Sequence, residues 1–318
     1  MEAALARGHV VTIFNRGQTN PGLFPEVERL RGDRDSDLSG LAGREWDAVI
    51  DTSGYVPRVV RTSAEALADN VRHYTFISSL SVFSPPSKHG LTESDAVTTL
   101  TDKTSEDVQA SYGPLKALCE RAVEEVFPRR SLNLRPGILV GPHDPTNRFA
   151  YWVRRLARGG DVLAPSPPEQ PVQLIDVRDF AARNVRMAEL RQTGTFHATG
   201  EPISFAQMLD ECDATVDREA RRVWADEDFL LEQGIEPFAD LPLWLATGQS
   251  EEWSGFFLID VSKAVAHGLS FRPLCKTARD VLVSADEPTG VKFGVEIPPE
   301  GLDQRREDEL LEAWKARA

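Results

Sequence analysis

Tyr112 and Lys116 are the two side chains of this sequence whose types and spacing first suggest chemistry. They stand four residues apart, so a helix that runs through both places them on one face, one turn from each other. An ammonium near a phenol favours the phenolate and lowers the pKa of the tyrosine from its usual value of about 10. The pair therefore predicts a general acid or base, with Tyr112 moving the proton.

A serine-rich turn precedes this pair, at the end of an apolar strand expected over residues 73–78. Its hydroxyls belong to Ser78, Ser79 and Ser81. In open α/β sheets, ligands bind where the parallel strands end, so this turn is a candidate binding element. A Tyr-x-x-x-Lys match can arise by chance and a serine-rich turn is often only a turn. Here the serine-rich turn, the Tyr112–Lys116 pair and residues 134–142 on the next strand follow one another in the chain. This order favours a functional role for them.

The elements that must position these residues alternate between strand and helix. Strands are expected at residues 10–14, 46–51, 73–78, 132–135, 172–176 and 196–200, and helices at 1–7, 58–70, 111–127, 178–189 and 303–317. Such alternation implies parallel strands joined by right-handed crossovers. We therefore predict an α/β fold with a doubly wound parallel sheet.

The texture of the chain changes beyond about Gly141, where prolines cluster and the expected elements become shorter. We predict a main domain over residues 1–140 and a smaller domain over residues 141–318, with the segment near 172–200 returning to the main domain. The final helix places Leu310, Leu311 and Trp314 on one face, which predicts that it docks by that face.

Composition argues against several classes of protein. The chain has 36 Lys and Arg against 50 Asp and Glu, a net charge of −14, which repels nucleic acid and anionic lipid. No apolar stretch approaches the roughly 18 residues of a membrane span, and the first residues lack the apolar region of a signal peptide. Cys119, Cys212 and Cys275 lie far apart and without metal-ligand spacing. We expect a cytoplasmic small-molecule enzyme with no metal, nucleic-acid or membrane partner.

Ser79 before Val82-Phe83, Tyr112 with Lys116, and Arg135-Pro136 together resemble the extended short-chain dehydrogenase/reductase superfamily, in particular its NAD(P)-dependent epimerase/dehydratase family. Two further segments, residues 176–179 and 196–200, carry the resemblance along nearly the whole chain. It implies a Rossmann-type dinucleotide-binding domain followed by a C-terminal substrate domain.

The resemblance also implies a reaction, hydride transfer at a carbon that bears oxygen. Tyr112 would donate or accept the hydroxyl proton, Ser79 would hydrogen-bond the same oxygen, and Lys116 would bias Tyr112 and hold the nicotinamide ribose. The substrate would be a small oxygenated molecule, with a nucleotide sugar as one candidate, and epimerase, dehydratase and reductase all stay open. The alternative is a non-catalytic NAD(P)-binding sensor or an RNA-associated Rossmann protein. A homodimer is a further expectation.

The cofactor is expected to be NADP or NAD. An arginine after the second strand of such a fold accommodates the 2′-phosphate of NADP, and Asn15-Arg16-Gly17 stands at that place. An exposed turn arginine is the alternative reading of Arg16. The cofactor-binding residues implied by the resemblance are Arg16, Asp33, Thr52, Ser53, Gly54, Ser78, Lys116 and Pro136. His143 is either a residue of the substrate loop or a turn histidine.

One part of the family pattern has no counterpart in the sequence, namely the first strand and the glycine-rich turn that would precede the helix at residues 1–7. A sheet without that central strand would expose two unpaired edges, at a cost beyond the stability margin of a domain. The expectation is therefore a misplaced start, with Met1 an internal residue and an upstream frame that encodes the missing elements.

Overall fold

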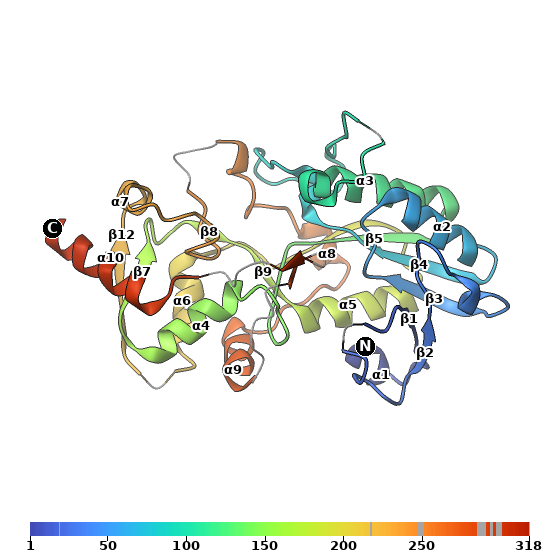
Figure 1. The fold of residues 1–318 in the computed structure, drawn as a ribbon, viewed down its shortest axis with the longest axis horizontal. Coiled ribbons are helices and arrows are strands. Elements are labelled where there is room, and N and C mark those ends of the chain that lie inside the picture. The colour runs from blue at the N-terminus through green and yellow to red at the C-terminus, as the bar shows by residue number, and fades with distance from the viewer. Residues whose placement is uncertain are drawn as a thin grey trace.

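The computed structural model describes residues 1–317 apart from 19, 103, 217, 247–250, 285–290, 293–294 and 297–300. Figure 1 shows two lobes along the long axis, one built on a parallel sheet and one formed by the C-terminal part of the chain. The parallel α/β architecture that the sequence predicts is present.

The main sheet has four parallel strands in the order β10-β5-β4-β3. The strands are β3 (Trp46–Asp51), β4 (Val71–Ile77), β5 (Ser131–Pro136) and β10 (Gly194–Ala198). Every residue of β5 is buried, as expected for a strand that is covered on both faces. A long helix separates β10 from the preceding strand in the chain. β10 nevertheless pairs with β5, so residues 194–198 belong to this sheet.

Helices cover both faces of the sheet. In Figure 1, α2 (Pro57–Leu67) and α3 (Val108–Val126) lie on one face, and α5 (Val177–Glu189) lies on the other. The first face encloses a core that includes Val60, Phe76 and Val123, and the second encloses a core that includes Leu134 and Phe180. The short 3-10 helices η1 (Ser39–Leu41) and η2 (Leu80–Phe83) follow β2 and β4 in the chain.

The sheet is interrupted beside β3. Strands β1 (Thr12–Asn15) and β2 (Glu28–Arg31) pair in parallel with each other only, as a separate two-stranded sheet. In the part of the chain that the structure describes, β3 has β4 as its one hydrogen-bonded neighbour. The interruption falls where the sequence analysis expects a first strand. Helix α1 (Glu2–Leu5) is shorter than the predicted 1–7 and is followed by Arg7, which pairs with Glu189 at the end of α5.

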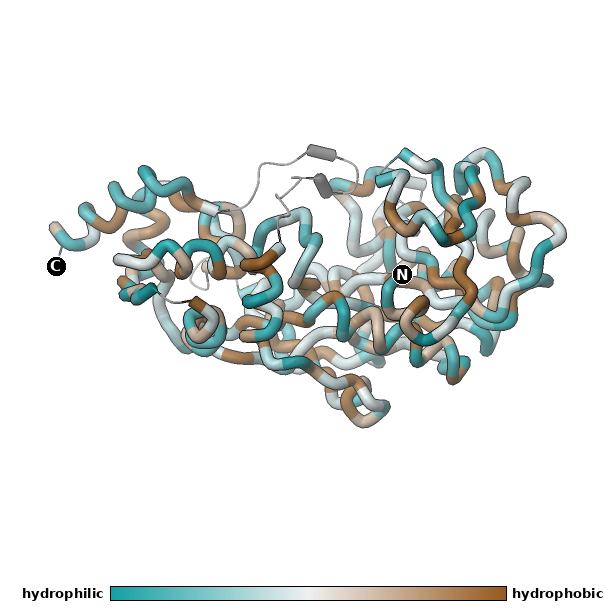
Figure 2. Tube along the Cα trace, turned by 90° about the horizontal axis from the view of Figure 1, so that it is seen from below, coloured by the Kyte–Doolittle hydropathy of each residue, from teal (hydrophilic) through white to brown (hydrophobic). Residues whose placement is uncertain are grey.

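The C-terminal lobe has its own core, which includes Trp152, Leu163, Phe205, Trp244 and Leu310. It is built from β7 (Gly160–Pro165) paired with β12 (Ala220–Ala225), and from α4 (Arg148–Arg158), α6 (Phe205–Asp213), α7 (Glu227–Glu232), α9 (Leu274–Val283) and α10 (Gln304–Arg317). Figure 2 shows hydrophobic and hydrophilic residues alternating along α10. Leu310 and Leu311 are buried, so the helix docks by the predicted face.

Short paired segments complete the fold. They are β6 (Ile138–Val140) with β9 (Leu174–Asp176), β8 (Pro171–Val172) with β11 (Ile203–Ser204), and β13 (Val291–Lys292) with β14 (Val295–Glu296), together with η3 (Glu251–Trp253) and α8 (Ser262–Ala266). No described helix has the length and apolar character needed to cross a membrane. The described residues also contain no group of three or more His, Cys, Asp or Glu side chains placed to hold a metal ion.

Candidate active site

Tyr112 and Ser79 meet where helix α3 crosses the end of strand β4. Ser79 is the N-terminal cap of η2, and its Oγ accepts a hydrogen bond from the Ser81 backbone N–H at 3.1 Å. The side chains of Ser79 and Tyr112 are hydrogen-bonded to each other. The structure therefore brings together two of the three residues that the resemblance selects as catalytic.

Gly113 allows this close approach of α3 to η2. A Cβ atom at position 113 would stand 2.0 Å from the Ser81 carbonyl oxygen, far inside van der Waals contact. The helix also bends here, because Ser111 has non-helical backbone angles of φ −135° and ψ 28°. The bend comes three residues before Pro114, whose ring excludes a regular helical turn on its N-terminal side. The predicted start at residue 111 thus marks a kink, while Asp107 caps the helix earlier by accepting from the Gln109 and Ala110 N–H groups.

Lys116 lies beneath this pair, in the interior of the protein. Its side chain is 2% exposed, and its Nζ donates to the carbonyl oxygens of Gly54 at 2.8 Å and Ile77 at 2.6 Å. The ammonium also lies 4.2 Å from the centre of the Phe76 ring. Burial lowers the pKa of Lys116 to about 8. Lys116 therefore joins the loop after β3 to the end of β4, the two segments that border the site.

The electrostatics of Tyr112 differ from the expectation that Lys116 favours its phenolate. Burial raises the pKa of Tyr112 to about 12 and outweighs the opposing effect of the Ser79 hydrogen bond. The Lys116 ammonium is directed to two backbone carbonyls. Tyr112 is accordingly a neutral phenol at neutral pH.

Tyr55 lies between Tyr112 and Lys116 and was not among the residues selected from the sequence. Its ring centre is 6.4 Å from that of Tyr112 and 5.5 Å from the Lys116 Nζ. Tyr55 directly follows the loop residues Thr52, Ser53 and Gly54, of which the first two are exposed and the third is buried. An aromatic residue next to a predicted cofactor loop is the signal that could have found it.

Arg148 approaches Tyr112 from the C-terminal lobe. It is the first residue of α4, and its positive charge acts to lower the Tyr112 pKa, although burial dominates. Its Nε donates to the Thr146 hydroxyl at 2.8 Å. The positive charge of Arg148 in the C-terminal lobe thus acts on the Tyr112 phenol in the sheet lobe. This electrostatic interaction could not be predicted from the sequence, because residues 112 and 148 belong to different lobes.

Ser78 and Pro136 occupy the ends of two neighbouring strands. Ser78 is 3% exposed, and its hydroxyl has no hydrogen-bond partner among the described residues. Pro136 ends β5 and is buried. The Arg135 side chain is occupied elsewhere, since it forms an ion pair with Glu120 on α3.

The remaining predicted cofactor residues belong to the β1–β2 unit. Arg16 is exposed in the turn after β1, where Gly17 lies against the Arg31 guanidinium. The Asp33 carboxylate accepts from the Asp35 N–H at 3.0 Å within its own turn. The next residue, Arg34, forms a two-point ion pair with Asp51 at the end of β3, at 2.8 and 2.7 Å.

The Arg34–Asp51 pair therefore ties the Asp33 turn to the main sheet despite the interruption between β1 and β3. Burial alone would raise the pKa of Asp51, but the hydrogen bonds and charge of Arg34 outweigh it and keep the pKa below its usual value. The Tyr74 hydroxyl donates to the same carboxylate at 2.8 Å. Among the described residues, no such ion pair ties Arg16 to the Ser79–Tyr112 region. His143, predicted as a substrate-loop or turn residue, is exposed with a φ of 67°.

Comparison with known proteins agrees with this arrangement. The sequence model of the "NAD dependent epimerase/dehydratase family" matches residues 43–198, the segment that carries Ser79, Tyr112 and Lys116. Over these residues, just under half of the chain, the sequence is similar to this family. The recognition made from the sequence is confirmed, and a family of epimerases and dehydratases is a family of enzymes. No protein of curated function matches the chain.

Solved structures with the same fold cover most of the chain. UDP-N-acetylglucosamine 4-epimerase from Bacillus cereus aligns with a TM-score of 0.61 at 15% identity, over 90% of this chain and 94% of that chain. WbmH from Bordetella bronchiseptica, in complex with NAD+, aligns with a TM-score of 0.62 at 15% identity, over 92% and 94%. The UDP-N-acetylglucosamine 4-epimerase of Methanobrevibacter ruminantium M1, in complex with UDP-N-acetylmuramic acid, gives 0.61 at 18%, over 88% and 92%. These likenesses confirm the Rossmann-type fold class.

Proposed function

We propose that this protein is an NAD(P)-dependent enzyme of the epimerase/dehydratase family that transfers a hydride at an oxygen-bearing carbon of a nucleotide sugar. The observation that carries the proposal is the hydrogen-bonded Ser79–Tyr112 pair at the end of β4, above the buried Lys116. The substrate class is supported by the solved relatives, which include UDP-N-acetylglucosamine 4-epimerases. Epimerase, dehydratase and reductase reactions share this first step.

The residues at the strand ends fit the nicotinamide half of the cofactor. The Ser78 hydroxyl is buried without a partner among the described residues, beside the Ile77 carbonyl that accepts from Lys116. A buried hydroxyl that lacks a partner is a hydrogen-bonding group left for a ligand. We assign Ser78, Lys116 and Pro136 to this half, and Thr52, Ser53 and Gly54 to the path of the dinucleotide. The bound cofactor supplies the site that takes up or gives back the hydride.

Asp33 and Arg16 are assigned to the far end of the cofactor. The Arg34–Asp51 pair holds the Asp33 turn against the end of β3, which supports the assignment of Asp33 to the adenosine part. Arg16, with Arg31 across the turn, offers guanidinium groups suited to a 2′-phosphate. This assignment favours NADP over NAD.

Tyr112 performs the proton transfer in this proposal. Its raised pKa keeps the phenol protonated, so it is prepared to donate to a carbonyl oxygen, and Ser79 hydrogen-bonds the same oxygen. In the opposite direction Tyr112 must accept a proton, and the positive charge of Arg148 assists by stabilising the phenolate.

Two further assignments accompany this function. We infer a dinucleotide-binding domain over residues 1–140 and a substrate domain over residues 141–318, supported by the separate core of the C-terminal lobe. Pairing of β10 with β5 supports the return of the chain to the first domain near residues 172–200. A homodimer is the assembly we propose, and light scattering on the purified chain tests it.

The test is Tyr112→Phe, assayed with UDP-N-acetylglucosamine and with NAD+ or NADP+ bound. We expect turnover to be lost while cofactor affinity, measured by fluorescence titration, is retained. Lys116→Ala should reduce both, because Lys116 is assigned to the cofactor and anchors two site segments. Tyr151→Phe is the matched control, since Tyr151 is buried in the C-terminal core. Turnover by Tyr112→Phe near the level of the unsubstituted protein would overturn the mechanism.

A further inference from the structure

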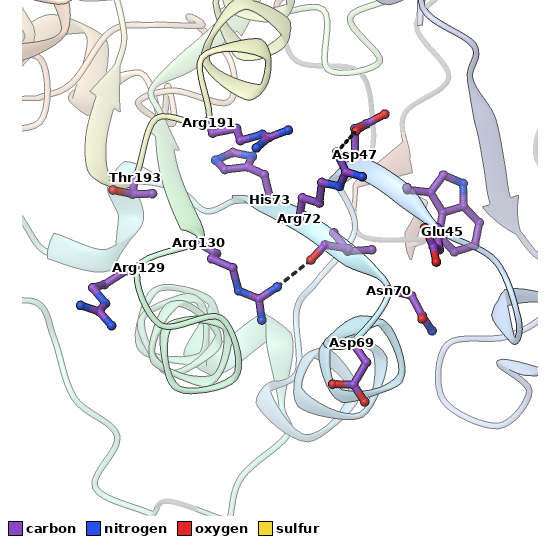
Figure 3. A pocket seen from close by; sticks show the side chains of 12 residues that line it. Glu45, Asp47, Asp69, Asn70, Arg72, His73, Arg129, Arg130, Arg191 and Thr193 are labelled. Atoms are coloured by element: carbon purple, nitrogen blue, oxygen red, sulfur yellow. Dashed lines mark hydrogen bonds and ion pairs between the residues drawn. The ribbon is translucent and has the colours of Figure 1, made fainter.

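A pocket formed by described residues (Figure 3) lies at the amino-terminal ends of the main-sheet strands, opposite the strand ends near Tyr112. It encloses about 670 Å³ and is bordered by residues at the amino-terminal ends of the strands, among them Trp46, Val71 and Thr193. The strands are parallel, so their other ends carry the candidate active site. β4 is seven residues long, so the two ends of the strands are about 20 Å apart. The pocket is therefore a site separate from that of Tyr112.

The walls of this pocket carry charges of opposite sign. Figure 3 shows Arg129, Arg130 and Arg191 on one side, and Glu45 and Asp69 on the other. The three arginines come from two loops, one before β5 and one before β10. An arginine cluster of this kind is notable in a chain with a net charge of −14. One side of the pocket is thus suited to an anion and the other to hydrogen-bond donors.

Two of these arginines are available to a ligand. Arg129 and Arg191 are exposed, and neither has an ion-pair partner among the described residues. Both adopt left-handed backbone conformations, with φ of 59° and 48°, which turns usually fill with Gly or Asn. Arg130 differs, because it donates to the carbonyl oxygens of Ala68 and Val71 and so holds the wall in place.

His73 adds a buried polar group to the same pocket. It is 1% exposed, and Figure 3 shows its ring beside Arg191. Its Nε2 donates to the Gln192 carbonyl oxygen at 2.8 Å, whereas its Nδ1 is buried with no hydrogen-bond partner in the described chain. A buried nitrogen of this kind is a hydrogen-bonding group for which the protein supplies no partner.

We propose that this pocket binds a small phosphorylated molecule, with its phosphate on the side of the arginines and its hydroxyl groups on the side of Glu45 and Asp69. Guanidinium groups bind phosphate through paired N–H donors, and several such groups on one side of the pocket add to its attraction for an anion. Carboxylates accept hydrogen bonds from hydroxyl groups but repel further anionic charge. The volume matches that of small-molecule sites, and the acidic wall disfavours a long polyanion such as RNA.

Isothermal titration of the full chain with glucose 6-phosphate tests this site. We expect saturable binding, with glucose and citrate each binding at least about tenfold more weakly, because one lacks the phosphate and the other lacks the sugar hydroxyls. No binding of glucose 6-phosphate, or equal binding of citrate, would overturn the proposal.

Variants locate the binding. Arg129→Ala and Arg191→Ala should each weaken glucose 6-phosphate by about tenfold, and the double variant more, since each removes a charge-assisted contact. Arg305→Ala is the matched control, because Arg305 is an exposed arginine on α10 with one long ion pair of 3.9 Å. Binding that is unchanged by both pocket variants, or that is lost with Lys116→Ala instead, would place the ligand elsewhere and refute the inference.

Discussion

The Glu120 carboxylate and the Arg135 guanidinium form a two-point ion pair in the interior, with Nε–Oε1 at 2.9 Å and Nη2–Oε2 at 2.7 Å. Both side chains are 6% exposed. Glu120 lies one turn after Lys116 on α3, and Arg135 directly precedes Pro136 on β5. The pair therefore fixes the helix that carries Tyr112 and Lys116 against the strand that carries Pro136.

Removing one partner of this pair should be costly. We expect Glu120→Ala to lower the free energy of unfolding by about 3–5 kcal/mol, because the Arg135 charge would stay buried and unpaired. Urea denaturation followed by circular dichroism measures the change. Glu125→Ala on the same helix is the control, since Glu125 is exposed and pairs with Arg61 at the surface. Its loss should cost about 0–1 kcal/mol, and equal effects of the two variants would contradict the structural role.

Gly113→Ala should separate α3 from η2. The added methyl group would meet the Ser81 carbonyl oxygen at 2.0 Å, so the helix or the turn must shift. We expect a loss of about 1–3 kcal/mol in the free energy of unfolding together with a loss of turnover, because the Ser79–Tyr112 contact depends on this approach. Gly22→Ala is the control, since nothing lies within 4 Å of its added methyl group. A Gly113→Ala variant as stable and active as the Gly22→Ala variant would refute this prediction.

The tyrosines of the folded protein should ionise at a higher pH than those of the unfolded chain. Burial raises the pKa of all four, Tyr55, Tyr74, Tyr112 and Tyr151, above the usual value of 10. The folded protein should show little phenolate absorbance at pH 10, where the unfolded chain in urea is about half ionised. Because folding favours the neutral phenols, their contribution to stability is complete below about pH 10 and is lost as the pH rises toward 12. Half-ionisation of the folded protein at pH 10 would disagree with this burial.

Arg16→Ala tests the choice of cofactor. If Arg16 contacts the 2′-phosphate, the variant should bind NADP more weakly by about 1.5–3 kcal/mol and bind NAD nearly unchanged. Fluorescence titration with both cofactors measures the two affinities. Arg44→Ala is the control, because the Arg44 guanidinium pairs with Glu28 at the surface of the same unit. Equal losses for NAD and NADP would show that Arg16 does not read the phosphate.

The sequence was sufficient for the architecture and for the central contact of the site. Short apolar stretches predicted the strands β3 and β4, because buried parallel strands need apolar residues on both faces. The Ser79–Tyr112 contact could be expected from the family pattern. The bend at Ser111 could not, since it depends on how Pro114 and Gly113 settle against η2.

The partners of the charged groups in the site and the direction of the pKa shifts could not be predicted from the sequence. Spacing alone places Lys116 near Tyr112, but it does not show that the ammonium is taken by the Gly54 and Ile77 carbonyls. The direction of a pKa shift depends on burial, which is a property of the packed structure. Tyr55 and Arg148 were missed for a related reason, because their contacts with Tyr112 join segments far apart in the chain.

The positive charge of Arg148 acts on the Tyr112 phenol from one lobe to the other. Tyr112 belongs to a helix of the sheet lobe, whereas Arg148 opens α4 in the C-terminal lobe. The charge felt by the phenol therefore depends on how far the lobes are closed. A hinge movement that opens them would withdraw the guanidinium and weaken its stabilisation of phenolate. If the lobes close around a substrate, the same movement would bring up the guanidinium and lower the pKa of Tyr112.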